Sequence, residues 1–318
     1  MSGRTTPPIL IFHPQAERYG ELLRERFADA SAVAVTDEAA FRRALPHAEV
    51  LVAQRFPAEI LVEPHGLRWV QVTAAGVEFL APVAGRTGDL LVTNARGVHR
   101  AIIADYAFAA MLALQWDLPA LQRDQAAKRW KPRRTRALDG RTVGIVGLGA
   151  IGQEIARRAV AFGMKVLAVR KSSAAAPDAA KVFPPDALHE CLALSDFVIL
   201  AVPATGETGR LIDRAAIAAM KPGAFLINVA RGSVVDEPAL AEALAEGRLG
   251  GACLDVFAEE PLPPESPLWT LPNVIVTPHM AGAAADYEER FTDIFADNLG
   301  RYASGEPLRN LVDLARGY

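Results

Sequence analysis

The chain has few cysteines, no long apolar run and no marked excess of charge, and each shortage excludes a class of protein. Only Cys191 and Cys253 occur among 318 residues, far apart, so we expect free thiols in a reducing compartment rather than a disulfide framework. The most apolar stretch, residues 101–116, contains Asp105 and is too short to cross a bilayer. The N-terminal apolar run, residues 9–12, is too short for a signal-peptide core. We therefore expect a cytoplasmic protein that does not contact membranes.

The formal net charge of -3 provides no overall attraction to a phosphate backbone, so a nucleic-acid partner is not expected. One stretch, residues 123–136, is nevertheless basic and carries seven Lys or Arg residues. Runs of like charge are usually solvated, and we interpret this one as a linker or a subunit-contact face. A nuclear-import or nucleic-acid patch is the alternative, and the acidic balance elsewhere weakens it. No metal site is predicted.

Short β-rich runs alternate with helical patterns along the whole chain, which is typical of parallel sheets covered by helices on both faces. Helices are expected at residues 16–27, at 37–45 with Thr36 as the cap, over the apolar stretch 98–118, and again in the tail from residue 281. Strands are expected at residues 9–12, 32–35, 48–53, 67–72 and 90–95, and in a second series at 142–146, 165–169, 197–202, 224–230, 250–256 and 273–278. The length and the two series predict an α/β protein of two domains.

The stretch RTVGIVGLGAIG, residues 141–152, places three glycines between a predicted strand and an amphipathic helix. In that context Gly147 permits a tight turn, Gly149 lets the backbone approach a pyrophosphate, and Gly152 lets helix and strand pack closely. Ala150 and Ile151 stand where the helix begins, and a helix N-terminus offers N–H donors and a favourable dipole to an anion. A purely structural turn is the alternative, and the context favours a dinucleotide.

At the end of the next predicted strand, where a carboxylate commonly binds the adenosine ribose, the sequence has Arg170, Lys171, Ser172 and Ser173. Two cations and two hydroxyls suit a 2′-phosphate, and no acidic side chain is available there for a free 2′-hydroxyl. The alternative is a solvated basic loop. We therefore predict NADP(H) as the preferred cofactor, with NAD(H) as the second choice.

Three further motifs follow predicted strands of the second series: NVARGSVVDEPAL (228–240), LDVFAEEPLP (254–263) and NVIVTPHMAG (273–282). Because parallel strands present their carboxyl ends at one edge, Arg231, Asp255, Glu260 and His279 are expected to converge there. Together with the glycine turn and VPATGET (202–208), WVQVTAAGVEFL (69–80) and residues 94–112, these motifs resemble the D-isomer-specific 2-hydroxyacid dehydrogenase family over nearly the whole chain.

The resemblance implies two doubly wound parallel-sheet domains. One is a Rossmann cofactor domain at residues 99–280, and the other is a flavodoxin-like substrate domain formed by residues 1–98 and 281–318. It also implies hydride transfer between a nicotinamide and the substrate C2, with Arg231, Glu260 and His279 as catalytic residues. The chemistry needs such a set, because a reduced 2-keto acid becomes an alkoxide that a histidine can protonate, a carboxylate can orient that histidine, and an arginine can polarise the keto oxygen.

The resemblance assigns further binding roles. Substrate contacts fall on Ala75, Gly76 and Val77 through backbone N–H groups, and on Arg231 and His279. Cofactor contacts beyond the glycine turn and the basic loop fall on Val202, Pro203, Thr208, Ala230, Asp255 and Gly282. His13 and His99 have no partner motif and are interpreted as structural.

The expected function is NADP-preferring reduction of a small 2-keto acid, such as glyoxylate or hydroxypyruvate, to the D-2-hydroxy acid by a homodimer. Trp130 lies in a region that relatives often place at the dimer contact, either near a partner's substrate pocket or simply at the interface. Two alternatives stay open: an NAD-dependent enzyme similar to phosphoglycerate dehydrogenase, and a dinucleotide-sensing interaction protein similar to the corepressors that resemble these dehydrogenases.

Overall fold

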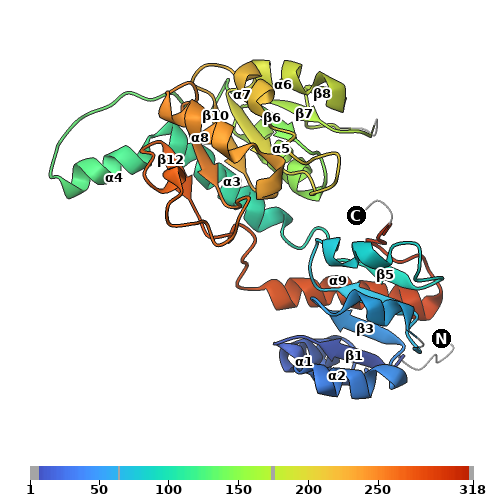
Figure 1. The fold of residues 1–318 in the computed structure, drawn as a ribbon. Helices are drawn as coiled ribbons and strands as arrows, with labels where there is room; N and C mark the ends of the chain where they lie inside the picture. The colour runs from blue at the N-terminus through green and yellow to red at the C-terminus, as the bar shows by residue number, and fades with distance from the viewer. Residues whose placement is uncertain (1–6, 64, 173–175, 315–318) are drawn as a thin grey trace. The chain divides into compact units, whose positions relative to one another are not determined.

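The computed structural model describes residues 7–63, 65–172 and 176–314, so Ser173 lies outside the described residues. The chain divides into two compact units, each with its own parallel sheet (Figure 1). Unit 1 contains residues 1–98 and 284–318, and unit 2 contains residues 99–283.

Unit 1 contains a five-stranded parallel sheet with the strand order β2-β1-β3-β4-β5, which is the flavodoxin-like order. Its strands are β1 (Ile9–Phe12), β2 (Ala32–Val35), β3 (Val50–Ala53), β4 (Trp69–Val72) and β5 (Leu91–Thr93). Its helices are α1 (Ala16–Arg26), α2 (Glu38–Ala44) and α9 (Tyr287–Ser304), with 3-10 turns at η1 (Leu45–His47), η2 (Ala58–Val62) and η3 (Glu78–Val83).

The last helix, α9, packs in unit 1 although it lies near the end of the chain. Phe291 and Phe295 are one turn apart on its apolar face and are buried with Tyr19 of α1 and Trp69 of β4. A strip of aromatic side chains at helical spacing is the kind of surface that a sheet face buries, and burying each such side chain contributes about 1.5–3 kcal/mol. This packing makes α9 part of the core of unit 1.

Unit 2 contains a seven-stranded parallel sheet with the order β12-β11-β10-β9-β6-β7-β8. Its strands are β6 (Thr142–Val146), β7 (Lys165–Val169), β8 (Lys181–Phe183), β9 (Phe197–Leu200), β10 (Phe225–Asn228), β11 (Gly251–Leu254) and β12 (Val274–Val276). Because β6 pairs with both β7 and β9, the strand order reverses beside β6, as in the Rossmann fold. The predicted fold class is confirmed.

Helices cover both faces of this sheet (Figure 1). They are α3 (Arg100–Gln115), α5 (Ala150–Ala161), α6 (Leu188–Leu194), α7 (Arg214–Ala219) and α8 (Glu237–Ala245). The unit also contains α4 (Leu118–Ala126) and 3-10 turns at η4 (Pro185–Ala187), η5 (Gly232–Val234) and η6 (Pro267–Trp269). Within the described residues no single helix is both long and apolar enough to cross a bilayer, and α3 and α4 reach that composition only as a pair bent by 61°.

Two local predictions were wrong. The cap of α2 is Asp37, whose carboxylate accepts from the Ala40 N–H at 2.8 Å, and not Thr36. The apolar helix expected over residues 98–118 ends at Gln115, because Asp117 adopts a left-handed conformation with φ of 48°. A new helix, α4, starts directly afterwards and takes in the first residues of the basic segment.

The region after α3 stands away from the sheet of its own unit (Figure 1). Asp124 of α4 is buried and forms ion pairs with Arg129 and Arg133, which ties the chain after α4 back to the helix. Large apolar side chains are nevertheless exposed along it: Trp116 is 53% exposed and Trp130 95%. Such exposure is typical of a surface that contacts another protein.

Candidate active site

The glycine turn between β6 and α5 has the geometry of a dinucleotide cradle. Gly147 has φ of 101°, and a Cβ there would lie 2.6 Å from the Ala201 carbonyl oxygen, so only glycine fits. A Cβ on Gly152 would overlap the Gly147 carbonyl oxygen. Gly149, in contrast, is the N-cap of α5, and a Cβ there would have no described atom within 4 Å. The turn therefore packs tightly on two sides and is open at the helix N-terminus, where a pyrophosphate would bind.

The basic residues after β7 differ from one another in their partners. Arg170 is held by its backbone N–H, which donates to Phe183 O at 3.1 Å, while its buried Nε has no hydrogen-bond partner among the described residues. Lys171 forms an ion pair with Glu207, and both side chains are mostly exposed. Ser172 is exposed. Sequence reasoning missed Glu207, because it lies 36 positions away in the 202–208 motif.

Residues 202–208 form a loop that is organised from within. The Thr208 hydroxyl donates to Pro203 O at 2.7 Å and accepts from the Thr205 N–H at 2.8 Å. Val202 packs close to the glycine turn, since its Cγ1 would lie 2.8 Å from a Cβ on Gly147. Thr208 therefore shapes this loop through its side chain, in addition to any contact that it makes with a cofactor.

His279, after β12, and Glu260, after β11, form a hydrogen-bonded pair. His279 Nδ1 lies 2.7 Å from Glu260 Oε2, so Nδ1 carries the proton toward the carboxylate and Nε2 is left for a substrate. Glu260 Oε1 accepts from the Phe257 N–H at 3.0 Å. Partial burial opposes ionisation of Glu260, but the bonds from His279 and Phe257 and the charge of Arg231 outweigh it and hold the pKa of Glu260 below its usual range.

Arg231 follows β10, and the residue after it explains how this loop reaches the neighbouring one. Gly232 lies against the backbone of Phe257, where any Cβ would overlap the Phe257 carbonyl group. The absence of a side chain thus lets the β10 loop touch the segment that holds Glu260. Arg231 also donates to the Ala230 carbonyl at 2.8 Å, and Ala230 itself is buried.

Asp255, predicted at the cofactor, is bonded to the loop that carries His279. Its buried carboxylate accepts from Thr277 Oγ1 at 2.6 Å and from the N–H groups of Met280 and Ala281, each at 2.8 Å. Its carbonyl oxygen accepts from the His279 N–H at 2.9 Å. Because His279 has φ of 51°, a conformation that residues other than glycine seldom adopt, these bonds hold the histidine in an otherwise unfavourable backbone state.

Tyr106 of α3 extends this set, and sequence reasoning missed it because an aromatic residue in an apolar helix is an ordinary core position. Its hydroxyl lies 2.6 Å from Thr277 Oγ1 and 3.2 Å from Cys253 Sγ. Thr277 donates its own proton to Asp255, so Tyr106 is the donor to Thr277. Burial raises the pKa of Tyr106 and keeps this donor protonated.

His99 and Gly282 also meet in unit 2. His99 Nδ1 donates to the Gly282 carbonyl at 2.9 Å, and a Cβ on Gly282 would come within 3.1 Å of that ring nitrogen. Burial lowers the pKa of His99, and the hydrogen bond to Gly282 only partly opposes this. The His99 ring therefore leaves little room for a side chain at position 282.

The loop after β4 in unit 1 presents free backbone donors. Asn94 Nδ2 donates to the Ala75 carbonyl at 2.8 Å, and the Ala95 N–H donates to the Ala74 carbonyl at 3.0 Å. In a trans peptide the N–H points opposite to the carbonyl, so the N–H groups of Ala75 and Gly76 are directed away from residues 94–95. Neither they nor the Val77 N–H has an acceptor within the described part of the chain. Consecutive N–H groups without acceptors are a feature of the backbone loops that bind anions in proteins.

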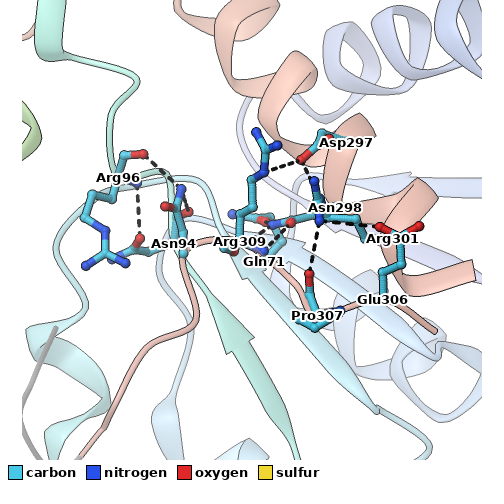
Figure 2. A network of polar contacts seen from close by, with 10 residues as sticks. Gln71, Asn94, Arg96, Asp297, Asn298, Arg301, Glu306, Pro307 and Arg309 are labelled. Carbon is cyan, nitrogen blue, oxygen red and sulfur yellow. Dashed lines mark hydrogen bonds and ion pairs between the residues drawn. The ribbon is translucent and has the colours of Figure 1, made fainter. Parts of the chain in front are cut away.

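Asn94 belongs to a set of polar contacts that includes the C-terminal segment (Figure 2). Asn310 donates to the carbonyls of Asn94 and Arg96 at 3.3 and 2.9 Å, and Asn298 of α9 holds the backbone of Arg309 through bonds of 3.0 and 2.8 Å. Tyr287, also of α9, donates to the Thr73 carbonyl. Asn310 and Tyr287 lie more than 200 positions from the residues they bond, and no local signal in the sequence identifies these two supports.

Unit 2 therefore brings together the glycine turn, Arg231, Glu260 and His279 at the carboxyl ends of its strands, and unit 1 holds the free N–H groups of residues 75–77. Among the residues that the structure describes, no group of three or more His, Cys, Asp or Glu side chains is placed to hold a metal ion.

Comparison with known proteins identifies the family. The model for the D-isomer specific 2-hydroxyacid dehydrogenase NAD binding domain matches residues 108–281. The chain is 37% identical to the glyoxylate reductase of Korarchaeum cryptofilum over 272 residues, covering 83% of this chain and 81% of that one. It is 31% identical over 315 residues to the D-3-phosphoglycerate dehydrogenase of Methanocaldococcus jannaschii, covering 96% of this chain but 59% of that longer protein.

A solved structure agrees with these matches. The NADPH-dependent glyoxylate/hydroxypyruvate reductase of Sinorhizobium meliloti, in complex with NADP and sulfate, superimposes with a TM-score of 0.86 at 26% identity, covering 98% of this chain and all of that one. The chain thus belongs to the D-isomer specific 2-hydroxyacid dehydrogenase family of NAD(P)-dependent oxidoreductases.

Proposed function

We propose that this protein reduces a small 2-keto acid, of the size of glyoxylate or hydroxypyruvate, to the D-2-hydroxy acid with NADPH. The observation that carries the proposal is the 2.7 Å bond between His279 Nδ1 and Glu260, which leaves Nε2 to act as the proton donor. The match to a glyoxylate reductase over most of both chains supports the substrate class.

The chain's own residues supply the acid chemistry. The nicotinamide, when bound, supplies the hydride to the substrate C2. His279 donates the Nε2 proton to the keto oxygen as negative charge develops there, and Glu260, ionised because its pKa is lowered, stabilises the charged imidazole through Nδ1. Arg231 polarises the same oxygen and binds the adjacent carboxylate with its planar fork.

The substrate carboxylate has a second set of donors in the loop after β4. The N–H groups of Ala75, Gly76 and Val77 form no bond within the described chain, and bonds from such groups to an anion contribute about 1.5–3 kcal/mol each. They favour substrates with a carboxylate over neutral aldehydes.

The cofactor preference depends on the positive charges of Arg170 and Lys171 after β7 and on the negative charge of Glu207 in the loop 202–208. Arg170, whose buried Nε has no partner within the described residues, and Ser172 suit a 2′-phosphate. The S. meliloti relative, whose structure contains NADP, supports this preference. Lys171 has to leave Glu207 to contribute, which is a small cost because exposed ion pairs are worth roughly 0–1 kcal/mol. NADPH is therefore proposed as the preferred cofactor and NADH as the weaker one.

We also propose a cytoplasmic homodimer. The exposed Trp116, Leu118 and Trp130 beside and beyond α4 support a second copy of the chain as the partner. The buried free thiols of Cys191 and Cys253 agree with a reducing compartment.

The test is a steady-state assay of glyoxylate, hydroxypyruvate, pyruvate and phosphohydroxypyruvate with each cofactor. We expect the highest kcat/KM with a small unphosphorylated keto acid and NADPH. Selective turnover of phosphohydroxypyruvate with NADH would favour the activity of the M. jannaschii relative instead. Dinucleotide binding without turnover of any keto acid would favour a sensing protein and contradict the proposal.

The cofactor proposal has its own variant. Replacing Arg170 with Asp and Lys171 with Ala should weaken NADPH binding selectively, leave NADH binding unchanged or improved, and reduce the salt sensitivity of NADPH binding. If the wild-type protein binds NADH as tightly as NADPH, or more tightly, the proposal is wrong and Arg170 and Lys171 are ordinary solvated surface residues.

A further inference from the structure

A cavity lies at the opposite edge of the seven-stranded sheet from the candidate active site. It has a volume of about 410 Å³, and Arg134, Arg136, Arg141, Gln115 and Phe225 contribute to its lining. Arg141 directly precedes β6 and Phe225 begins β10, so the cavity is at the amino ends of these strands. The glycine turn and the catalytic pair follow the carboxyl ends, a strand length of roughly 13–17 Å away.

The lining carries positive charge that other described residues do not balance. Neither Arg134 nor Arg136 forms an ion pair with a carboxylate anywhere in residues 7–63, 65–172 and 176–314. Their neighbours Arg129 and Arg133, in contrast, both pair with Asp124, and Arg133 also pairs with Asp117.

The third arginine shares its only nearby carboxylate within the described chain. Arg141 Nε lies 3.4 Å from Asp196 Oδ2, and Asp196 also binds Lys221 Nζ at 3.2 Å. One carboxylate thus serves two cations. The cavity keeps a net positive charge, and because Arg134 and Arg136 are exposed to solvent, this charge can attract an anion from solution.

One buried acceptor in the lining, Gln115 Oε1, lacks a hydrogen-bond partner in the described part of the chain. Buried groups without partners are uncommon in native proteins, and they often mark a place where a ligand or a water binds. An anion that also carries a hydroxyl group can donate to this acceptor.

The cavity wall is also pre-organised. The Thr135 hydroxyl donates to the Gln115 carbonyl at 2.6 Å, and Gln115 Nε2 donates to the Arg136 carbonyl at 2.9 Å. These bonds anchor the end of the basic segment on the last turn of α3. Arg134 and Arg136 are therefore presented from a fixed stretch of backbone, which lowers the entropy cost of binding.

We propose that this cavity binds a small polyvalent anion, a phosphate ester or a hydroxylated polycarboxylate, at a site separate from the one that binds substrate. Guanidinium groups recognise the oxygens of such anions in a planar fork, and the Phe225 ring provides an apolar wall for a short carbon skeleton. This proposal gives a role to Arg134 and Arg136, the two arginines of the basic segment that line the cavity.

The experiment is titration of the full chain with inorganic phosphate, pyrophosphate and citrate, at constant ionic strength, followed by calorimetry. We expect saturable binding of at least one of these anions, and at least a tenfold loss of affinity in the double variant Arg134→Gln, Arg136→Gln. The matched control is Lys128→Gln, Lys131→Gln, which removes the same charge from the same segment without touching the cavity lining, and it should bind as the wild type does.

Two further measurements distinguish this cavity from the cofactor loop and from a nucleic-acid surface. Titration in the presence of saturating NADP+ keeps anion binding at the cofactor loop out of the measurement, and the binding that remains should still be lost in the Arg134, Arg136 double variant. No saturable binding, or an equal loss in both double variants, would overturn the proposal. Tighter binding of a single-stranded oligonucleotide than of pyrophosphate would overturn it as well, in favour of a nucleic-acid surface.

Discussion

Asn94→Ala tests whether the loop after β4 binds the substrate carboxylate. Asn94 is 3% exposed, and the change removes its bonds to the Ala75 carbonyl and to the Arg96 N–H, of 2.8 and 3.1 Å. Without the first bond the peptide between Ala75 and Gly76 is no longer held, so the Gly76 N–H loses its direction. One misdirected donor to an anion costs about 1.5–3 kcal/mol, which corresponds to a KM higher by roughly 10–150-fold.

The split between kinetic parameters is the informative readout. The carboxylate is bound equally in the ground state and the transition state, so KM for glyoxylate should rise while kcat changes little. Two bonds lost at a buried site also lower the free energy of unfolding, by about 1–3 kcal/mol. Asn273→Ala is the matched control, because Asn273 likewise bonds a backbone carbonyl, that of Leu244 at 3.1 Å, but lies in unit 2.

The reasoning fails if Asn94→Ala lowers the melting temperature as the control does while KM stays within about twofold of the wild type, a change worth less than roughly 0.5 kcal/mol. It also fails if the wild type reduces a neutral aldehyde as efficiently as glyoxylate, because a carboxylate site would then contribute nothing to recognition.

The other predictions concern the catalytic pair and its support. His279→Ala should lower kcat by about two or more orders of magnitude with little change in cofactor affinity, and near wild-type turnover would remove His279 from the mechanism. Because the folded-state pKa of Glu260 is lowered, its contribution to stability is full above the usual glutamate range and is lost as pH falls through the lowered value. Urea unfolding across that acid range should therefore show a smaller loss of unfolding free energy in Glu260→Gln than in the wild type. Identical plots of unfolding free energy against pH for the two proteins would contradict the assignment. Tyr106→Phe should reduce kcat by about three- to tenfold and stability by about 1 kcal/mol, since the donor to Thr277 is lost; a stability loss with unchanged kcat would leave Tyr106 a core residue only.

Local patterns in the sequence were sufficient for the fold class and for the edge of the sheet where the candidate residues meet. Buried parallel strands need short apolar runs, and the glycine turn needs a residue without a side chain at positions 147 and 152, so both are visible in neighbouring residues. The carboxyl ends of parallel strands lie at one edge, which is why Arg231, Glu260 and His279 could be grouped before any coordinates. Element ends were less predictable, as the cap at Asp37 and the break at Asp117 show.

Pairings between distant side chains were decided only by the tertiary structure. The Lys171–Glu207 pair, the Tyr106–Thr277–Asp255 chain and the bond from Asn94 to the Ala75 carbonyl each join segments that are separated by 19 to 171 positions. A side chain finds such a partner through the path of the backbone, which depends on how whole elements pack and not on its neighbours in sequence. The amino-acid sequence thus determined which chemistry this protein carries, and the packing of its elements decided which residues hold that chemistry in position.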